Sequence, residues 1–207
     1  MSTEDVKKSW TSIASKYSHD SGLITELWDE IVTAYTSPNR HYHNLHHISF
    51  MLQLFHQYEE KLIKKGEVLF SIFYHDIIYD VKSRKNEENS VKYAALRLLK
   101  LGVSPTAINR ISKMIVSTKH HEPTDNMDNN YLLDFDLAIL SAPEKEYKLY
   151  TDQIRNEYLL YPKTMYRFGR KRLLKNLLRQ SSIYATEDFQ SRNQKALINL
   201  ERELYSF

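Results

Sequence analysis

The sequence predicts an all-α protein. Only four glycines and five prolines occur among 207 residues, and runs of alternating β-branched residues are almost absent. Apolar residues instead recur every three or four positions along most of the chain, as they do on the buried face of a helix. A chain of this length fits one domain with a substantial core. We therefore expect a single helical domain.

Helical spacing predicts the elements of the first half of the chain. A pattern of apolar residues covers about residues 6–35 and breaks near Ser21-Gly22. Ser37-Pro38-Asn39 has the composition of a turn. The same spacing resumes over about residues 45–62 and 67–79, so we expect two more helices there.

Helix start signals organise the second half. The polar segment 86–90 precedes a helical pattern, with Asn86 as a candidate N-cap. Ser104-Pro105 repeats the signal with proline in the first turn, and that helix is expected to end near Thr118. The remaining helices are expected over about residues 131–140, from residue 141 to a break at Pro162, and over about 163–180 and 187–204.

The composition limits the functions that the chain can have. Without cysteine there can be no disulfide, thiolate zinc site or cysteine nucleophile, so a metal would need nitrogen and oxygen ligands. A net charge of +3 creates no strong field for nucleic acid, and the basic segment 167–179 carries leucines at packing intervals. Because no signal-peptide pattern and no apolar run of roughly 20 residues occur, we expect a cytoplasmic protein that does not cross a membrane.

A histidine beside an aspartate, His75-Asp76, interrupts the apolar stretch 70–80. Such groups are costly in an apolar setting unless they are paired, and a metal ion is a natural partner. Four histidines lie within residues 41–47, two at 120–121, and two aspartates within 134–136. Seven of the nine histidines thus fall in three short windows, which would build a metal site if they converge.

The candidate ligands are two imidazoles and two carboxylates. His47, His75, Asp76 and either Asp134 or Asp136 would provide them from three expected helices. This donor set suits Mn, Fe, Co, Ni or Zn, whereas Mg favours oxygen ligands. Each residue could instead be a hydrogen-bonded core group or a solvated helix end. The adjacent His-Asp pair, with candidate ligands before and after it, favours the metal.

These residues resemble the H…HD…D signature of the HD-domain metal-dependent phosphohydrolases, an all-helical superfamily. The segments RHYHNLHHI, FYHDIIYD, NEENSV, STKHH, LLDFDLAIL, IRNEY and FGRKRLL are similar to one branch of predicted metal-dependent phosphohydrolases along almost the whole chain. The resemblance implies a single-domain HD-type helical bundle over residues 1–207. It also implies a metal-site core over about residues 38–160, with N- and C-terminal helices packed on it.

The resemblance further implies which residues hold a divalent metal ion. We expect its ligands to be His47, His75, Asp76 and Asp136. The last ligand of the family usually lies in an Ala-Asp-x-Leu context, which Asp136, between Phe135 and Leu137, resembles loosely, and Asp136 is preferred to Asp134. A His-His-Glu run joins the site in members with a second metal, and residues 120–122 are similar. From this run we take His120 as the catalytic histidine.

The expected chemistry follows from the ion. A bound metal lowers the pKa of water and polarises a phosphoryl oxygen, and Asp76 could also position the attacking water. His43, one turn before His47, is a further catalytic candidate. Arg155 and Glu157 cannot share a helix face, and we expect Arg155 to face the cavity and Glu157 to lie outside it. The candidates for substrate binding are Arg40, Lys82, Asn86, Thr118, Arg155 and Arg170.

Together these features predict a metal-dependent phosphohydrolase that acts on a small phosphorylated metabolite. Analogy with the superfamily favours a nucleotide, while the lack of a glycine-rich sequence after the histidine run argues against cyclic dinucleotides. The alternative is a catalytically silent module that senses a metal or a nucleotide. Nucleic acid and membranes are not expected partners, and a homodimer is compatible with the sequence.

Overall fold

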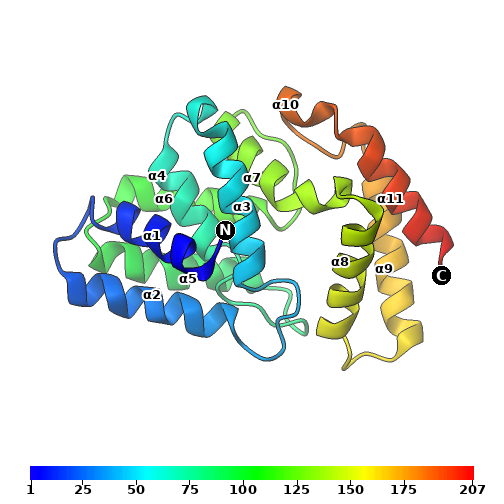
Figure 1. Cartoon of the computed structure of the whole chain (residues 1–207), viewed down its shortest axis with the longest axis horizontal. Helices are drawn as coiled ribbons and strands as arrows, with labels where there is room; N and C mark the ends of the chain where they lie inside the picture. Colours follow the sequence, from blue (N-terminus) through cyan, green and yellow to red (C-terminus); the bar gives the residue numbers. More distant parts are fainter.

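The computed structural model describes all residues, Met1–Phe207, and confirms the all-α prediction (Figure 1). It contains eleven α-helices, two short 3-10 helices and no strand. The α-helices are α1 Thr3–Ala14, α2 Ser21–Tyr35, α3 Leu45–Tyr58, α4 Lys65–Tyr74, α5 Asn86–Lys100, α6 Pro105–Ser117, α7 Met127–Leu137, α8 Glu144–Glu157, α9 Lys163–Leu178, α10 Glu187–Gln190 and α11 Asn193–Tyr205; the 3-10 helices are η1 Glu59–Lys61 and η2 Ala138–Ser141.

Side-chain caps explain several helix starts. Asp20 caps α2 by accepting a hydrogen bond from the N–H of Leu23, so the expected break separates α1 from α2. Ser104 caps α6, with proline in its first turn as expected. Asn126 caps α7, which therefore begins at Met127, four residues before the expected start at 131.

Two expected boundaries differ near the candidate site. The helix expected over residues 67–79 is α4, which ends at Tyr74, so the His-Asp pair follows the helix instead of lying inside it. Asn86 is the first helical residue of α5, and Lys85 occupies the cap position. The side chain of Asn86 instead bonds the backbone of Asp80, which closes the loop between α4 and α5.

The helices surround one continuous apolar core that includes residues from Val6 to Leu200. α4 lies near its centre and packs against α3, α6 and α7. Trp10 of α1 contacts the rings of Phe70, Phe73 and Tyr74 edge-on, which fixes α1 against α4. None of the helices combines the length and apolar character that crossing a bilayer requires.

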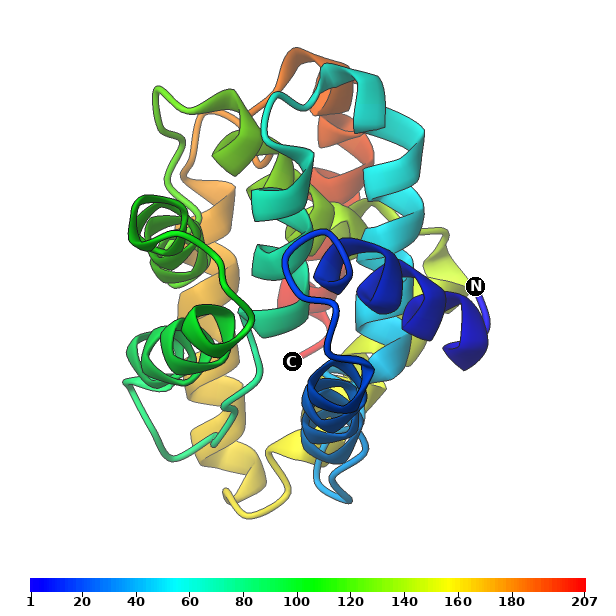
Figure 2. The same ribbon diagram turned by 90° about the vertical axis from the view of Figure 1, so that its left-hand side faces the viewer.

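The N-terminal and C-terminal helices lie on opposite sides of the molecule (Figures 1 and 2). α1 and α2 are on one side, and α8, α9 and α11 are on the other. α11 packs on α9 and η2, and α8 also contacts η2. The link through η2 places α7, which carries Asp136, beside the C-terminal helices.

Candidate metal centre and adjoining cavity

His47 reaches the interior from the first turn of α3. Asn44 caps this helix by accepting a hydrogen bond from the N–H of His46. His47 is almost fully buried, and burial lowers the pKa of its imidazole because a charged ring would lose its hydration. A neutral imidazole can offer its lone pair to a metal ion.

The His-Asp pair is held in place where α4 ends. The Nδ1–H of His75 donates to the carbonyl of Ile72 at 2.9 Å, which leaves Nε2 facing the centre. Arg40 donates to the carbonyls of Asp76 and Ile77 at 2.6 and 2.9 Å. These bonds satisfy backbone carbonyl groups that follow the end of α4 and fix the backbone of the pair.

Asp136 of α7 completes a compact group with the two histidines. Its Oδ1 lies 3.1 Å from Nε2 of His47 and 3.8 Å from Nε2 of His75, and the two Nε2 atoms are 3.2 Å apart. The three segments that the sequence singled out therefore meet, and this buried His47, His75 and Asp136 group could hold a metal ion.

The donor distances fit a single ion. Two atoms that each lie about 2.1 Å from an ion are about 3.0 Å apart at right angles and about 3.4 Å apart in a tetrahedron. The observed separations of 3.1 to 3.8 Å fall close to this range. Oδ2 of Asp76 lies 3.3 Å from Nε2 of His75 and is a fourth candidate donor.

The charges of the group are strongly coupled. Burial opposes protonation of His75, but the nearby carboxylates of Asp76 and Asp136 outweigh it and raise the pKa of His75 to about 9. Burial disfavours both carboxylates as anions, yet the histidines hold the pKa of each well below its usual value. The carboxylates therefore remain charged and available to a cation at neutral pH.

His121, and not His120, contacts this group. Nε2 of His121 lies 2.8 Å from Oδ2 of Asp136, whereas His120 is exposed to solvent. His121 lies beyond α6 with a φ of 53°, a left-handed conformation that is uncommon for a residue with a side chain. The sequence pointed to His120, but the structure places His121 beside the group, because the chain turns after the helix.

Asp134 has a different role from Asp136. Its carboxylate accepts hydrogen bonds from the N–H groups of Ala185 and Thr186 and from the hydroxyl of Thr186. These bonds hold the segment that precedes α10 against α7. Asp136 is thus the aspartate that faces the candidate metal centre, as the sequence preferred.

His43 belongs to a hydrogen-bonded pair with Glu157. Its Nδ1 lies 2.7 Å from Oε2 of Glu157, which leaves Nε2 free, 4.0 Å from Oδ2 of Asp76. The ring of His43 stacks on Tyr79, whose hydroxyl also donates to Glu157. Burial opposes a charge on His43, but the bond to Glu157 and the nearby carboxylates raise its pKa.

Glu157 does not line the cavity, in agreement with the expectation that it lies outside it, but it is buried behind His43. Burial would raise its pKa, but bonds from His43 and from the N–H of Tyr42 lower the pKa of Glu157 to about 2. Glu157 is the last residue of α8, an end at which helix dipoles disfavour anions. This role was not predicted from the sequence; an acid at the C-terminal end of a helix is the signal from which it could have been found.

The other proposed substrate-binding residues are mostly engaged elsewhere. Arg155 donates to the carbonyls of Tyr158 and Tyr161 and does not line the cavity, contrary to expectation. Arg40 is occupied by the carbonyls at the end of α4, Lys82 is exposed, and Asn86 closes its loop. None of these four side chains lines the cavity.

Thr118 and Arg170 do line the cavity. The hydroxyl of Thr118 donates to the carbonyl of Ile115, the backward bond expected of a helix-end threonine. Arg170 is buried and forms two bonds with the carboxylate of Glu203, at 2.7 and 3.0 Å. Its charge is therefore neutralised within the protein.

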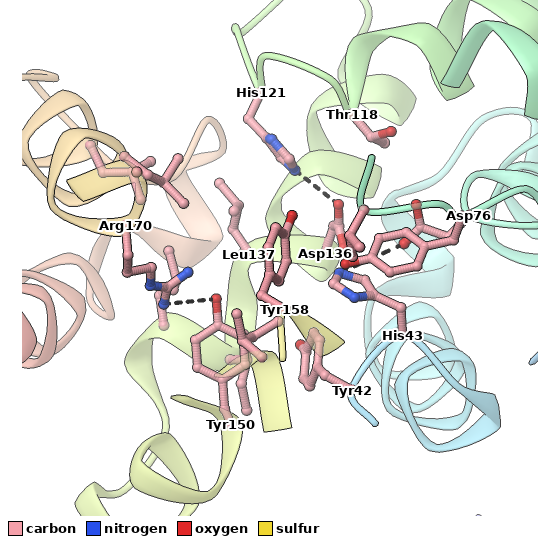
Figure 3. Close-up of a pocket in the computed structure, with 18 of the residues that line it drawn as sticks. Tyr42, His43, Asp76, Thr118, His121, Asp136, Leu137, Tyr150, Tyr158 and Arg170 are labelled. Atoms are coloured by element: carbon pink, nitrogen blue, oxygen red, sulfur yellow. Dashed lines mark hydrogen bonds and ion pairs between the residues drawn. The ribbon is translucent and has the colours of Figure 1, made fainter. Parts of the chain in front are cut away.

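A cavity of about 590 Å³ opens beside the candidate metal centre. Figure 3 shows Asp76, Asp136, His43 and His121 together at one end, with Arg170 at the other. Asp76 and Asp136 each line the cavity, whereas His47 and His75 lie behind them. A ligand in the cavity would thus meet the carboxylates and the two partly exposed histidines.

Comparison with protein-family models, curated proteins and solved structures finds no match to this chain. Membership of the HD-domain superfamily therefore stays a prediction from the motifs.

Proposed function

We propose that this protein is a metal-dependent phosphohydrolase of the HD-domain superfamily that acts on a small phosphorylated metabolite. The observation that carries the proposal is the convergence of His47, His75 and Asp136 at the wall of a cavity. Imidazole and carboxylate groups brought together in the interior from three distant segments are costly unless they are paired, and a metal ion would pair all three at once. The order of the motifs supports the same conclusion.

The donor set defines which ions fit. Imidazole nitrogens with carboxylate oxygens favour Mn, Fe, Co, Ni or Zn over Mg. When bound, such an ion supplies Lewis acidity at a phosphoryl oxygen and lowers the pKa of a water molecule. Asp76 lines the cavity and accepts a hydrogen bond from the attacking water, which orients it.

The histidines at the cavity handle protons. Hydrolysis forms a bond between a water oxygen and phosphorus and breaks the bond between phosphorus and the ester oxygen. The water loses one proton and the departing oxygen gains one. His43 donates a proton to the departing oxygen from Nε2, because Nδ1 is committed to Glu157 and the raised pKa favours the protonated ring. The proton lost by the water passes to solvent, and His43 regains a proton from solvent after the ester bond is broken. His121 lines the same end of the cavity beside Asp136 and contacts a phosphoryl oxygen.

The test combines metal analysis with phosphate release. Protein purified without chelator is analysed for metal and then assayed on p-nitrophenyl phosphate with Mn, Co, Ni, Zn or Mg. Wild type should bind metal stoichiometrically and release phosphate. Asp136→Asn should lose at least about tenfold in metal affinity and in turnover, while its helical circular dichroism persists.

Asp125→Asn is the matched control, because Asp125 is exposed in the loop before α7. It should keep both metal and activity. Unchanged metal affinity in Asp136→Asn would refute the ligand assignment. Stoichiometric metal without release from any phosphoester would refute the enzyme and favour the sensor.

A further inference from the structure

The cavity beside the candidate metal centre has two unlike ends. Carboxylates and histidines lie at one end. The other end lies between α8 and α9 and is lined by apolar and aromatic side chains, among them Ile154, Tyr166, Leu173 and Leu177. A volume of about 590 Å³ is sufficient for a ligand much larger than phosphate. Most of the surface of such a ligand would contact these apolar and aromatic side chains.

Gly169 leaves room along the α9 wall. Met165, Gly169, Leu173 and Leu177 recur every four residues and all line the cavity, so they share one face of the helix. Glycine inside a helix costs about 1 kcal/mol relative to alanine. Close packing does not require it here, since a Cβ at Gly169 would meet no atom within 4 Å. The missing side chain therefore enlarges the apolar end.

The cavity offers no free arginine or lysine. Arg170 is the single arginine or lysine that lines it, and the carboxylate of Glu203 already neutralises it. Glu87 adds a further carboxylate to the wall. Chains of phosphates normally need several cationic partners. The site is thus suited to one phosphoryl group at the metal end and not to a polyphosphate.

The apolar end also offers few partners for a nucleoside. No asparagine, glutamine, serine or lysine lines the cavity. The hydroxyls of Tyr79 and Tyr161 donate within the protein, and that of Tyr150 accepts from Arg170. The remaining hydroxyls of the tyrosines that line the cavity are those of Tyr42, Tyr158 and Tyr166. A base and a ribose carry more donors and acceptors than these hydroxyls can pair, and each group buried without a partner costs about 1–3 kcal/mol. A hydrocarbon has no such cost.

We infer that the substrate is a phosphate monoester of an apolar alcohol, with its phosphoryl group at Asp76 and Asp136 and its hydrocarbon part between α8 and α9. This inference rests on the proposed phosphohydrolase function and narrows its substrate class. Water adds to phosphorus, and the products are inorganic phosphate and the free alcohol, which keeps the proton supplied at the ester oxygen.

The experiment uses two homologous series on the metal-loaded full chain. Ethyl, butyl, hexyl and octyl phosphate are assayed for phosphate release, and the corresponding alkyl phosphonates, whose P–C bond cannot be hydrolysed, are titrated calorimetrically. Each methylene that leaves water can raise affinity or kcat/KM by up to about fourfold. We expect octylphosphonate to bind at least about 30-fold tighter than ethylphosphonate, and octyl phosphate to be preferred similarly.

Gly169→Phe tests the position of the chain, because its ring would occupy the apolar end. It should reduce the octyl-to-ethyl ratio at least about tenfold while metal content and circular dichroism are retained. Lys175→Phe adds the same ring on the exposed surface of α9, away from the cavity. It should leave the octyl-to-ethyl ratio unchanged in both phosphate release and phosphonate affinity.

The outcomes separate the two proposals. If phosphonate affinity and phosphate release both rise with chain length, and Gly169→Phe removes this dependence, both proposals are supported. If phosphonate affinity rises with chain length but no phosphate is released, the hydrolase proposal is refuted and the apolar ligand site is retained. Equal affinity for ethyl- and octylphosphonate, or faster release from nucleoside monophosphates than from octyl phosphate, would overturn the inferred substrate class alone.

Discussion

Replacing Glu157 by glutamine would test how the site is held together. The carboxylate accepts four hydrogen bonds, from the N–H groups of Tyr42 and His43 at 2.7 and 2.9 Å, from Nδ1 of His43 at 2.7 Å and from the hydroxyl of Tyr79 at 2.9 Å. An amide can keep the bonds to one oxygen. Its NH₂ group would face two donors at the position of the other oxygen, so at least one bond is lost.

The lowered pKa of Glu157 sets the size of the effect. Because the folded state lowers this pKa from 4.5 to about 2, the charged form contributes about 3 kcal/mol to stability at pH 7. This contribution is present above pH 4.5 and is lost as the pH falls towards 2. About 2 kcal/mol would remain at pH 3.5.

The assay is urea unfolding followed by circular dichroism at pH 7 and at pH 3.5. Glu157→Gln should be less stable than wild type by about 3 kcal/mol at pH 7, and the difference should shrink at pH 3.5. Glu146→Gln is the control, because Glu146 is exposed on the same helix, and a change within about 0.5 kcal/mol is expected.

A Glu157→Gln variant with the wild-type midpoint at pH 7 would refute the reasoning. So would a stability difference that stays constant between pH 7 and pH 3.5. Either result would mean that the carboxylate does not carry a charge that the fold stabilises.

Two further substitutions probe the neighbouring groups. His121→Ala should lower kcat on p-nitrophenyl phosphate at least about tenfold, whereas His120→Ala should not, and equal effects would place the functional histidine elsewhere. Arg170→Met should lower the free energy of unfolding, measured in urea, by about 3–5 kcal/mol because it leaves the carboxylate of Glu203 buried without a countercharge. The double variant Arg170→Met with Glu203→Leu should recover most of this loss. No recovery would contradict this account.

The residues of the candidate centre could be predicted because burying them requires a partner. His75 and Asp76 lie in an apolar stretch of sequence, and His47 lies on the buried, mainly apolar face of α3. Each would be unfavourable in the interior alone. Sequence reasoning therefore identified the segments that converge, and the helices that carry them were predicted from their periodicity.

The end of α4 was harder to predict from the sequence. Apolar residues continue to Ile77 and Ile78, and this periodicity extends the expected helix through the His-Asp pair. The helix ends earlier because the carbonyls of Asp76 and Ile77 find a donor in Arg40, 36 and 37 residues away. A contact at that separation leaves no trace in local periodicity. The same bonds convert Arg40 from a candidate substrate ligand into a support for the site.

The orientation of Arg155 and Glu157 depended on groups outside their helix. Periodicity places the two side chains on different faces but does not decide which one points inward. The backbone N–H groups of Tyr42 and His43 precede α3 and need acceptors. Glu157 provides them, so the carboxylate turns inward, while Arg155 bonds carbonyls that follow α8.

The charge state of the centre connects its stability with its proposed chemistry. Two carboxylates, Asp76 and Asp136, face one another across His75, whose raised pKa shows that a positive charge is favoured at this point. A proton on His75 can supply that charge, but it blocks the lone pair that a metal ion needs. Proton and ion therefore compete for the same nitrogen. A divalent ion would carry twice the charge of the proton, and Asp76 and Asp136 would offer it carboxylate oxygens, so the proposed centre should favour the ion near neutral pH.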